Sequence, residues 1–288
     1  MPRVSICIPT KNAKRDLPRL CAALARQQLA GESELVVVDS SSSDGTPALL
    51  ARAGARVVTI PAAEFGHGRT RNALARLAEG EIVVFLTQDA EPRDPHTLAT
   101  LVGALDDPRT AGAFARLLPR PDDDPLTART ALDHPDAADV AWTGEPGARE
   151  VRFNDVASAI RRDVLLALPF PDVAFGEDLA WARAALAAGY RVRFEPRAVV
   201  LHAHRYTPRQ AFERYRVDAA FQREELGRVV RPSALSVLKG IAHELRADLA
   251  YVARHGGWSH LPRAVLLRAA QVRGQRAGSR GPVARQPG

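Results

Sequence analysis

Short hydrophobic runs alternate with helical patterns along the first ninety positions of the chain. The four runs occupy residues 4–8, 35–38, 56–60 and 82–86. Runs of this length, bounded by polar residues, Gly or Pro, are typical of buried parallel strands. Amphipathic stretches lie between them, and the first carries Leu17, Leu20 and Leu24 on one face. This alternation predicts βαβ units, and therefore an α/β, Rossmann-like fold with a mainly parallel sheet and helices on both faces.

The pattern beyond residue 90 is less regular. It predicts helices at 97–105 and 178–188 and strands at 111–118, 191–194 and 198–203. A further helix is expected to start at Thr207-Pro208, because Pro is favoured in a first helical turn. The segment 125–146 shows no pattern from which we predict a structure.

Two amphipathic stripes follow that last helix. The first comprises Leu235, Leu238, Leu245, Leu249 and Val252, and the second comprises Trp258, Leu261, Val265, Ala269 and Val272, with Arg263, Arg268 and Arg273 interleaved. The last fifteen residues lack periodicity and are rich in Gly, Arg and Pro, a composition typical of disorder. We therefore expect an α/β domain over 1–225, amphipathic basic helices over 226–273 and a disordered tail over 274–288.

Charge is unevenly distributed along the 288 residues. The net charge is +7, and from Arg228 onward there are eleven Lys and Arg against two Asp and Glu. That balance of +9 leaves about −2 for the rest of the chain. A basic end can contact an anionic membrane or nucleic acid, or form a solvated face. Because this region lacks aromatic residues interleaved along a basic groove, we do not expect nucleic acid as a partner.

Composition points to a globular protein of the cytoplasm. Hydrophobic residues make up 46% and charged residues 25% of the chain, which allows a sizeable core. No apolar run is long enough to span a bilayer, and the strand pattern begins too early for a secretory signal. Cys7 and Cys21 are expected to be reduced core residues.

Polar residues follow three of the predicted strands, at 9–12, 39–43 and 87–91. Neither GxGxxG nor GxxxxGK[ST] occurs, which disfavours dinucleotide-binding and P-loop sites. Ligands of open α/β sheets bind beyond the carboxyl ends of strands, so a nucleotide could lie across these three ends. Asp39 could accept a hydrogen bond from a base or ribose, and Arg71 and Asn72 could reach phosphate or ribose.

Asp89 follows the fourth predicted strand. Its carboxylate could hold a divalent cation against a pyrophosphate, or serve as a turn or capping residue. His202 and His204 have the spacing that places two side chains on the same side of a strand. They are either packing residues or, together with Asp89, ligands of a metal.

Adjacent acids, Glu177 and Asp178, stand at the start of a predicted helix. Acidic residues are common there because they interact favourably with the helix dipole. The alternative is a general base, because a carboxylate beside an apolar, aromatic wall can have a raised pKa and accept a proton from a sugar hydroxyl.

Six segments, occurring in the family's order over about residues 3–225, resemble family 2 inverting glycosyltransferases of the GT-A fold. The similarity is greatest to the bacterial rhamnosyltransferase-type branch used in surface polysaccharide assembly. The segments are VSICIPTKN (4–12), VVVDSSSSDGT (36–46), FGHGRTRN (65–72), GEIVVFLTQDA (80–90), FGEDLAW (175–181) and 189–204, which ends in VVLHAH. The segments 116–121 and 154–162 also resemble that branch.

The resemblance implies a role for each candidate residue. The nucleotide-sugar site would comprise Pro9, Thr10, Asn12, Asp39, Ser41, Arg71, Asn72 and Gln88. Asp89 would be the last Asp of a DxD motif that holds Mg²⁺ or Mn²⁺ on the diphosphate, and His202, with His204 as its substitute, would complete the metal site. Asp178 would be the catalytic base, supported by Glu177. Asn154 and Trp181 would lie on the acceptor side.

One departure affects the metal. The triplet Thr87-Gln88-Asp89 lacks the first carboxylate of DxD, a form that this branch often has. It predicts a weaker metal affinity and leaves strict metal dependence open.

The leading hypothesis is inverting transfer of a sugar, with L-rhamnose favoured, from a dTDP- or UDP-sugar to a glycan or lipid-linked acceptor in surface polysaccharide synthesis. The alternative is a non-catalytic nucleotide-sugar-binding or scaffold protein of the same fold. For residues 233–276 we weigh peripheral contact with the anionic inner face of the cell membrane against packing on the catalytic domain.

Overall fold

The computed structural model describes residues 4–131, 143–144 and 151–280. Its first half is the predicted parallel sheet. The strands are β1 (Val4–Thr10), β2 (Ser33–Asp39), β3 (Arg56–Thr59) and β4 (Ile82–Leu86). They lie in the order β3-β2-β1-β4, and all three pairings are parallel. The carboxyl ends of β1, β2 and β4 therefore meet at one edge of the sheet.

The second half makes the sheet mixed rather than mainly parallel. Its strands are β5 (Glu91–Pro92), β6 (Thr110–Leu118), β7 (Thr143–Gly144), β8 (Ala157–Arg161) and β9 (Arg191–Leu201). Strand β8 runs antiparallel to both β4 and β6, whereas β6 and β9 are parallel. Strands β5 and β7 each pair antiparallel with β9. The sequence analysis missed β8 because that strand contains no long hydrophobic run, and the two short strands expected after 190 form one strand, β9.

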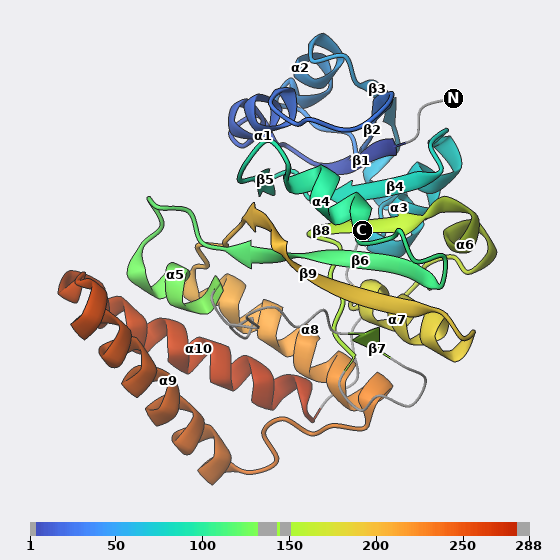
Figure 1. Ribbon diagram of the computed structural model, residues 1–288. Coiled ribbons are helices and arrows are strands. Elements are labelled where there is room, and N and C mark those ends of the chain that lie inside the picture. The colour runs from blue at the N-terminus through green and yellow to red at the C-terminus, as the bar shows by residue number, and fades with distance from the viewer. Residues whose placement is uncertain (1–3, 132–142, 145–150, 281–288) are drawn as a thin grey trace.

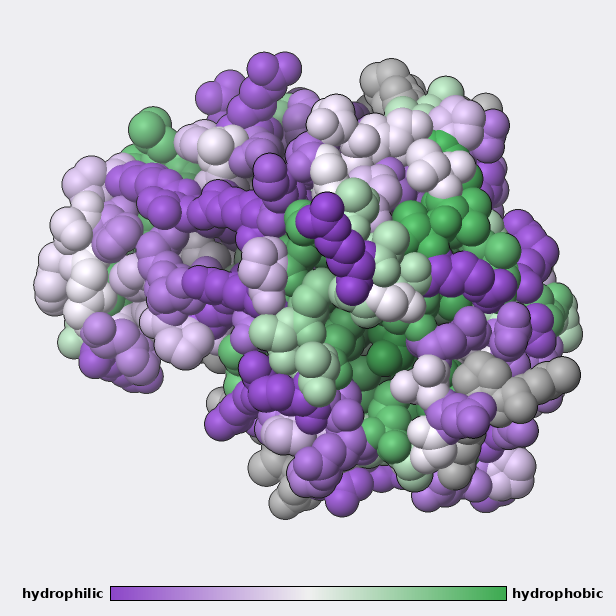
Figure 2. Space-filling model, turned by 90° about the horizontal axis from the view of Figure 1, so that it is seen from above, coloured by the Kyte–Doolittle hydropathy of each residue, from purple (hydrophilic) through white to green (hydrophobic). Residues whose placement is uncertain are grey.

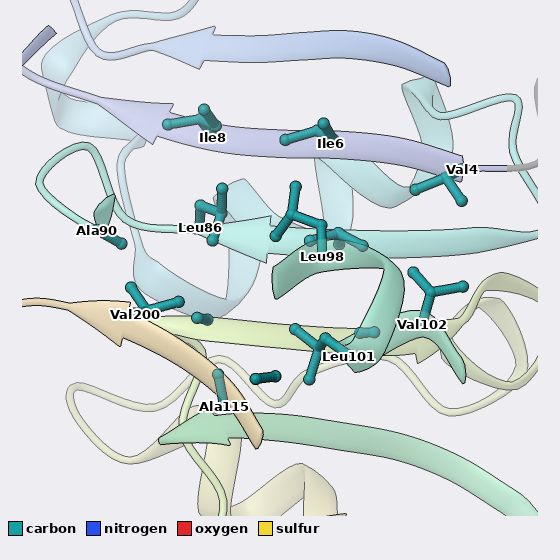
Figure 3. Close-up of a cluster of buried hydrophobic side chains, with 14 of the residues drawn as sticks. Val4, Ile6, Ile8, Leu86, Ala90, Leu98, Leu101, Val102, Ala115 and Val200 are labelled. Atoms are coloured by element: carbon teal, nitrogen blue, oxygen red, sulfur yellow. The ribbon is translucent and has the colours of Figure 1, made fainter. Parts of the chain in front are cut away.

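Helices cover both faces of the sheet, as predicted (Figure 1). One face is covered by α1 (Leu17–Ala25), α2 (Thr46–Arg52) and α4 (Thr97–Gly103), and the other by α3 (His67–Leu77), α6 (Arg162–Ala167) and α7 (Glu177–Ala187). Alternate strand residues point to opposite faces. Ile6 and Ile8 thus pack with Leu98 and Leu101 of α4 in the hydrophobic core on one face of the sheet (Figure 3). Cys7, between them in the sequence, lies in the core on the other face.

The remaining helices pack together at one end of the sheet, at the bottom of Figure 1. They are α5 (Pro125–Ala131), α8 (Pro208–Leu226), α9 (Ala234–His255) and α10 (Leu261–Gly278). The short 3-10 turns are η1 (Ala62–Glu64) and η2 (Trp258–His260). Helix α8 starts with a capping box between Thr207 and Gln210, as the Thr-Pro start predicts. Leu126, Ala211, Ala264 and Leu267 form a small core shared by α5, α8 and α10.

Helix α10 corrects the predicted start of the disordered tail at 274. It continues to Gly278, and both Gly274 and Gly278 are buried. A Cβ atom at Gly274 would collide with the carbonyl oxygen of Phe212 in α8, and one at Gly278 would collide with that of Arg216. The glycines that suggested disorder therefore allow two helices to approach closely. Residues 281–288 lie outside the described part of the chain, as does most of the segment 125–146 beyond α5.

The surface of the molecule is mixed in character. Figure 2 shows one face, on which hydrophobic side chains gather near the middle and hydrophilic ones dominate the left side. Within the described ranges, no helix is both long and apolar enough to cross a bilayer.

The close approach of α10 to α8 predicts that Gly274→Ala destabilises the protein. The added methyl group must push α10 away from the Phe212 carbonyl, and overpacking of this kind costs about 1–3 kcal/mol. Gly103→Ala is the control, because a Cβ atom there has no described neighbour within 4 Å. Thermal unfolding should show a clearly lower Tm for Gly274→Ala alone. Equal Tm values for the two variants would contradict the packing argument.

Candidate active site

A buried arginine and three carboxyl groups meet between α3 and α7. Arg71 Nη1 donates a 2.6 Å hydrogen bond to Glu177 Oε1, and Arg71 Nε lies 3.5 Å from Asp155 Oδ2. The side chains of Arg71, Asp155 and Glu177 are 6%, 0% and 7% exposed. Asp178 completes the cluster, since its Oδ2 accepts a 3.3 Å hydrogen bond from the Asp155 backbone N–H. We call these four residues the acid cluster.

The acid cluster holds more negative groups than positive ones. Burial and the neighbouring Glu177 raise the pKa of Asp178 to about 6. Burial, together with the charges of Asp178 and Glu177, raises the pKa of Asp155 to about 7 despite the opposing effect of Arg71. Two such close groups titrate as a pair. The pair can therefore exchange a proton near neutral pH, which is the property required of a general base.

The turn before α7 aims Asp178 at a cavity. Gly176 precedes the helix with φ 75°, and a Cβ atom there would collide with the ring of Phe221. Glycine is therefore favoured here for two reasons: it adopts a positive φ without strain, and it leaves room for the Phe221 ring. Asp178 is the second residue of α7, and its Oδ1 accepts a 2.7 Å hydrogen bond from the Leu179 backbone N–H.

The cavity beside Asp178 has a volume of about 570 Å³. Its lining includes Asn154, Phe175, Tyr206, Arg214, Tyr215 and Phe221. Both amide atoms of Asn154 are buried and have no hydrogen-bond partner among the described residues. An aromatic wall with unpaired polar groups suits a sugar, which presents both C–H faces and hydroxyl groups.

Trp181 corrects an expectation, because it does not line this cavity. It is fully buried, donates its Nε1–H to the Leu168 carbonyl at 2.9 Å and packs between Phe153 and Phe170. Its indole is enclosed by core residues, whereas Asn154 does line the cavity.

Asp89, His202 and His204 come together, and the two histidines also line the cavity beside Asp178. Their ligand atoms lie within 4.8 Å of one another, and Asp89 Oδ2 is 3.4 Å from His202 Nε2 and 3.7 Å from His204 Nδ1. The β5–β9 pairing explains this, since Glu91 opposite Leu201 brings residues 89 and 202 side by side. We call these three residues the Asp–His cluster.

The Asp–His cluster fits a divalent cation. His202 Nε2 is buried and has no hydrogen-bond partner among the described residues. Burial lowers the pKa of His204 to about 4, so its imidazole is neutral at pH 7. Burial disfavours the charge of Asp89, but His202 and His204 outweigh that effect and hold its pKa well below the usual value. Two imidazole nitrogens and a carboxylate suit Mn²⁺ better than Mg²⁺, which prefers oxygen ligands.

The loops after β1 and β2 are tied to each other around Asp39. Its carboxylate accepts hydrogen bonds from Thr10 Oγ1 at 2.8 Å and from the N–H and Oγ of Ser42 at 2.8 and 2.6 Å. Asp39 is completely buried. Asn12 and Ser41 have φ values of 48° and 57°, a left-handed conformation that is rare outside glycine and is often found at functional sites.

Three residues expected to contact the nucleotide have protein partners instead. Arg71 is held in the acid cluster. Asn72 exchanges two 2.9 Å hydrogen bonds with the backbone of Phe170. Gln88 does the same with Lys11, accepting from its N–H at 2.8 Å and donating to its carbonyl at 3.2 Å. The middle residue of Thr87-Gln88-Asp89 thus joins the ends of β1 and β4. Pro9 and Thr10 lie at the end of β1.

Two charged residues were missed by the sequence analysis. Asp155 is in the acid cluster, and Arg120 donates to the Asp89 carbonyl while its buried Nε has no hydrogen-bond partner in the described structure. Arg120, Arg15, Arg19 and Arg205 line a second cavity, of about 660 Å³, that also includes Asp89. The only available signal was that 120 and 155 lie in segments resembling the rhamnosyltransferase-type branch.

Comparison with known proteins agrees with this geometry. The model of "Glycosyl transferase family 2" matches residues 5–154. The O-antigen chain rhamnosyltransferase RfbN of Salmonella typhimurium is 33% identical over 221 residues, which cover 74% of this chain and 70% of RfbN.

Solved structures share the fold. The mannosyltransferase PcManGT of Pyrobaculum calidifontis, in complex with GDP-Man and Mn²⁺, superposes with a TM-score of 0.62 at 24% identity, covering 96% of this chain and 86% of PcManGT. TarS of S. aureus with UDP-GlcNAc gives 0.58 at 17% identity, covering 97% and 90%. Both are glycosyltransferase folds with a nucleotide sugar bound.

The acid cluster predicts that Arg71→Met strongly destabilises the protein. Removing the only cation that touches Asp155 and Glu177 in the described structure leaves buried carboxylates unpaired, which costs about 3–5 kcal/mol. Above pH 7 both raised-pKa acids are ionised, whereas near pH 5 they are protonated. The loss in free energy of unfolding should therefore be larger at pH 8 than at pH 5.

Arg69→Met is the matched control on the same helix. Arg69 is 53% exposed and pairs with the exposed Asp172, an interaction of little energetic value. Chemical denaturation of both variants at the two pH values checks the prediction. A pH-independent loss in Arg71→Met would show that its side chain acts by packing rather than by charge.

Proposed function

The chain belongs to glycosyl transferase family 2, and on this premise we propose that it is an inverting glycosyltransferase with Asp178 as its base. One observation carries the proposal. One cavity is lined both by the raised-pKa carboxyl of Asp178 and by His202 and His204 of the Asp–His cluster. A base and a site for the leaving group around one sugar-sized space are what a single displacement requires.

In the proposed reaction, Asp178 accepts the proton of an acceptor hydroxyl. The acceptor oxygen bonds to the anomeric carbon from the face opposite the diphosphate, and the bond between that carbon and the diphosphate oxygen breaks. The products are an inverted glycoside and a nucleoside diphosphate, with no covalent enzyme intermediate. The backbone N–H groups of Asp155 and Leu179 keep the Asp178 carboxylate in position, and burial together with the neighbouring Glu177 makes Asp178 basic.

Asp89, His202 and His204 would hold a divalent cation, with Mn²⁺ favoured. When bound, such a cation would neutralise charge that develops on the leaving diphosphate. PcManGT was solved with Mn²⁺ and a nucleotide sugar, which supports this assignment. Arg120 donates to the Asp89 carbonyl, and its Nε lies 3.8 Å from Glu91 Oε2; its guanidinium would contact the diphosphate in place of Arg71. The positive charge of Arg120 would then compensate for the weaker metal binding expected where Thr87 replaces the first carboxylate of DxD.

The donor is proposed to be a dTDP- or UDP-sugar carrying L-rhamnose, and the acceptor a glycan or lipid-linked glycan. RfbN, a rhamnosyltransferase of O-antigen chains, supports this choice of sugar and polymer. The loops around Asp39 and Asn12 would receive the nucleoside at the strand ends. Because Asp39 is enclosed by Thr10 and Ser42, these loops would have to part for the base to reach its carboxylate.

The role of Asp178 predicts that Asp178→Asn lowers turnover by about 10²–10⁴ and leaves donor binding unchanged. Asp172→Asn, on an exposed carboxyl, is the control. In the wild type, the base must be ionised, so the rate should rise with pH and level off above a pKa near 6. Initial rates of sugar transfer between pH 5 and 8 check both points. Near-normal turnover in Asp178→Asn would remove Asp178 from this role.

Calorimetry with dTDP, UDP and GDP, with and without Mn²⁺, tests the donor site. We expect dTDP or UDP to bind more tightly with Mn²⁺, and Asp89→Ala to abolish the Mn²⁺ effect, since it removes the carboxylate of the Asp–His cluster. Asp172→Ala should behave as the wild type. Tight donor binding without transfer to any glycan would favour the scaffold alternative instead.

A further inference from the structure

Large hydrophobic side chains reach the surface mainly in one part of the chain. The described residues include eight exposed ones, and seven of them lie between 229 and 266: Val229, Leu235, Leu238, Leu249, Trp258, Val265 and Leu266. The other is Leu166 in α6. Scattered exposed apolar residues are normal, but a concentration in two neighbouring helices marks an interaction surface.

On α9 these residues form a stripe. Leu235, Leu238 and Leu249 are 59%, 66% and 48% exposed, and their spacing of three and eleven residues places them on one face of the helix. The buried residues of α9 are Gly240, Asp248 and Val252. Figure 1 shows α9 at the outer edge of the molecule, with α10 between it and α8. We call the stripe of Leu235, Leu238 and Leu249 the outer apolar face.

The charges around the outer apolar face are all of one sign. Residues 228–280, which are described throughout, contain two acids, and both point inward. Asp248 binds Arg268 and Arg129, and Glu244 binds Arg129. Among the exposed bases of this segment are Lys239 and Arg246 of α9, which lie beside the leucine stripe. The buried Arg268 and the half-buried Arg263, expected to be interleaved with the stripe on α10, instead bind Asp248 and Asp124.

We propose that the outer apolar face docks on an anionic lipid bilayer. A bilayer offers hydrocarbon to the leucines and negative headgroups to Lys239 and Arg246 at the same time. A soluble polyanion would leave the leucines in water. A second copy docked on the same face would oppose its bases with bases, and no acid on this segment faces outward to pair with them.

This docking does not depend on the transferase activity, but it complements that activity. Helix α8, against which α10 packs, supplies Arg214, Tyr215 and Phe221 to the cavity beside Asp178. A bilayer on the outer apolar face is therefore separated by α10 from the helix that lines the proposed acceptor site. A lipid-linked acceptor would reach the cavity from the surface on which the enzyme rests.

Co-sedimentation of the full chain with phosphatidylcholine vesicles, with and without phosphatidylserine, tests the proposal. We expect binding that requires phosphatidylserine, and at least a tenfold loss of bound protein in both Leu238→Glu/Leu249→Glu and Lys239→Glu/Arg246→Glu. Leu166→Glu is the control, since it removes an exposed leucine from a different surface. These variants should keep the Tm of the wild type, because all five side chains are exposed or partly exposed.

Three outcomes would overturn the proposal. The first is vesicle binding that ignores phosphatidylserine, and the second is an equal loss in Leu166→Glu. The third is a dimer in sedimentation velocity that Leu238→Glu/Leu249→Glu dissociates, which would make the face a subunit interface. Transfer to a soluble glycan acceptor should be unchanged in the α9 variants. If that assay fails in the wild type while vesicle binding holds, the proposed function fails and the membrane contact stands.

Discussion

The buried pairing of one guanidinium with two carboxylates, beside a third carboxyl group, is the constraint on which the rest of this structure depends. Arg71 of α3 joins Asp155, which precedes β8, to Glu177 at the start of α7. It thereby connects three segments distant in the sequence. Because one cation cannot neutralise three buried anions, a proton is retained near neutral pH, and the acids lying closest to each other have raised pKa values. Burial and Glu177, which Arg71 holds in place, make Asp178 basic, whereas the charge of Arg71 opposes that shift.

Strand pairing supplies the other half of the site. The parallel order of β1, β2 and β4 gathers three polar strand ends at one edge, and the Gln88–Lys11 pair holds two of them together. The short β5–β9 ladder then brings Asp89 to His202. The proposed cation site therefore depends on backbone pairing, whereas the proposed base depends on buried charge. Asp178, His202 and His204 line one cavity, as the proposed displacement requires.

Helices α9 and α10 also keep acidic side chains inside and basic ones at the surface. Their two acids are used internally, with Arg129 and Arg268, so the exposed side is left basic and apolar. Gly274 and Gly278 let α10 settle on α8, which ties this surface to the helix lining the cavity. The helix that lines the cavity is thereby joined, through α10, to the helix whose surface is proposed to meet the membrane.

The sequence by itself determined the local elements and the family. Hydrophobic runs and glycine stops predicted β1 to β4 and their helices, because period and caps are local properties. The motifs around Asp89, Asp178 and His202 predicted which residues share a site. Only tertiary structure decided that β8 runs antiparallel, that Arg71, Asn72 and Gln88 bind protein, that Trp181 is buried and that Asp155 joins the base. Burial and charge compensation are properties of neighbours in space, and spacing along a chain does not contain them. The same reason explains why the sequence did not predict the end of α10: its glycines are unfavourable in an isolated helix and are accounted for only by close packing against α8.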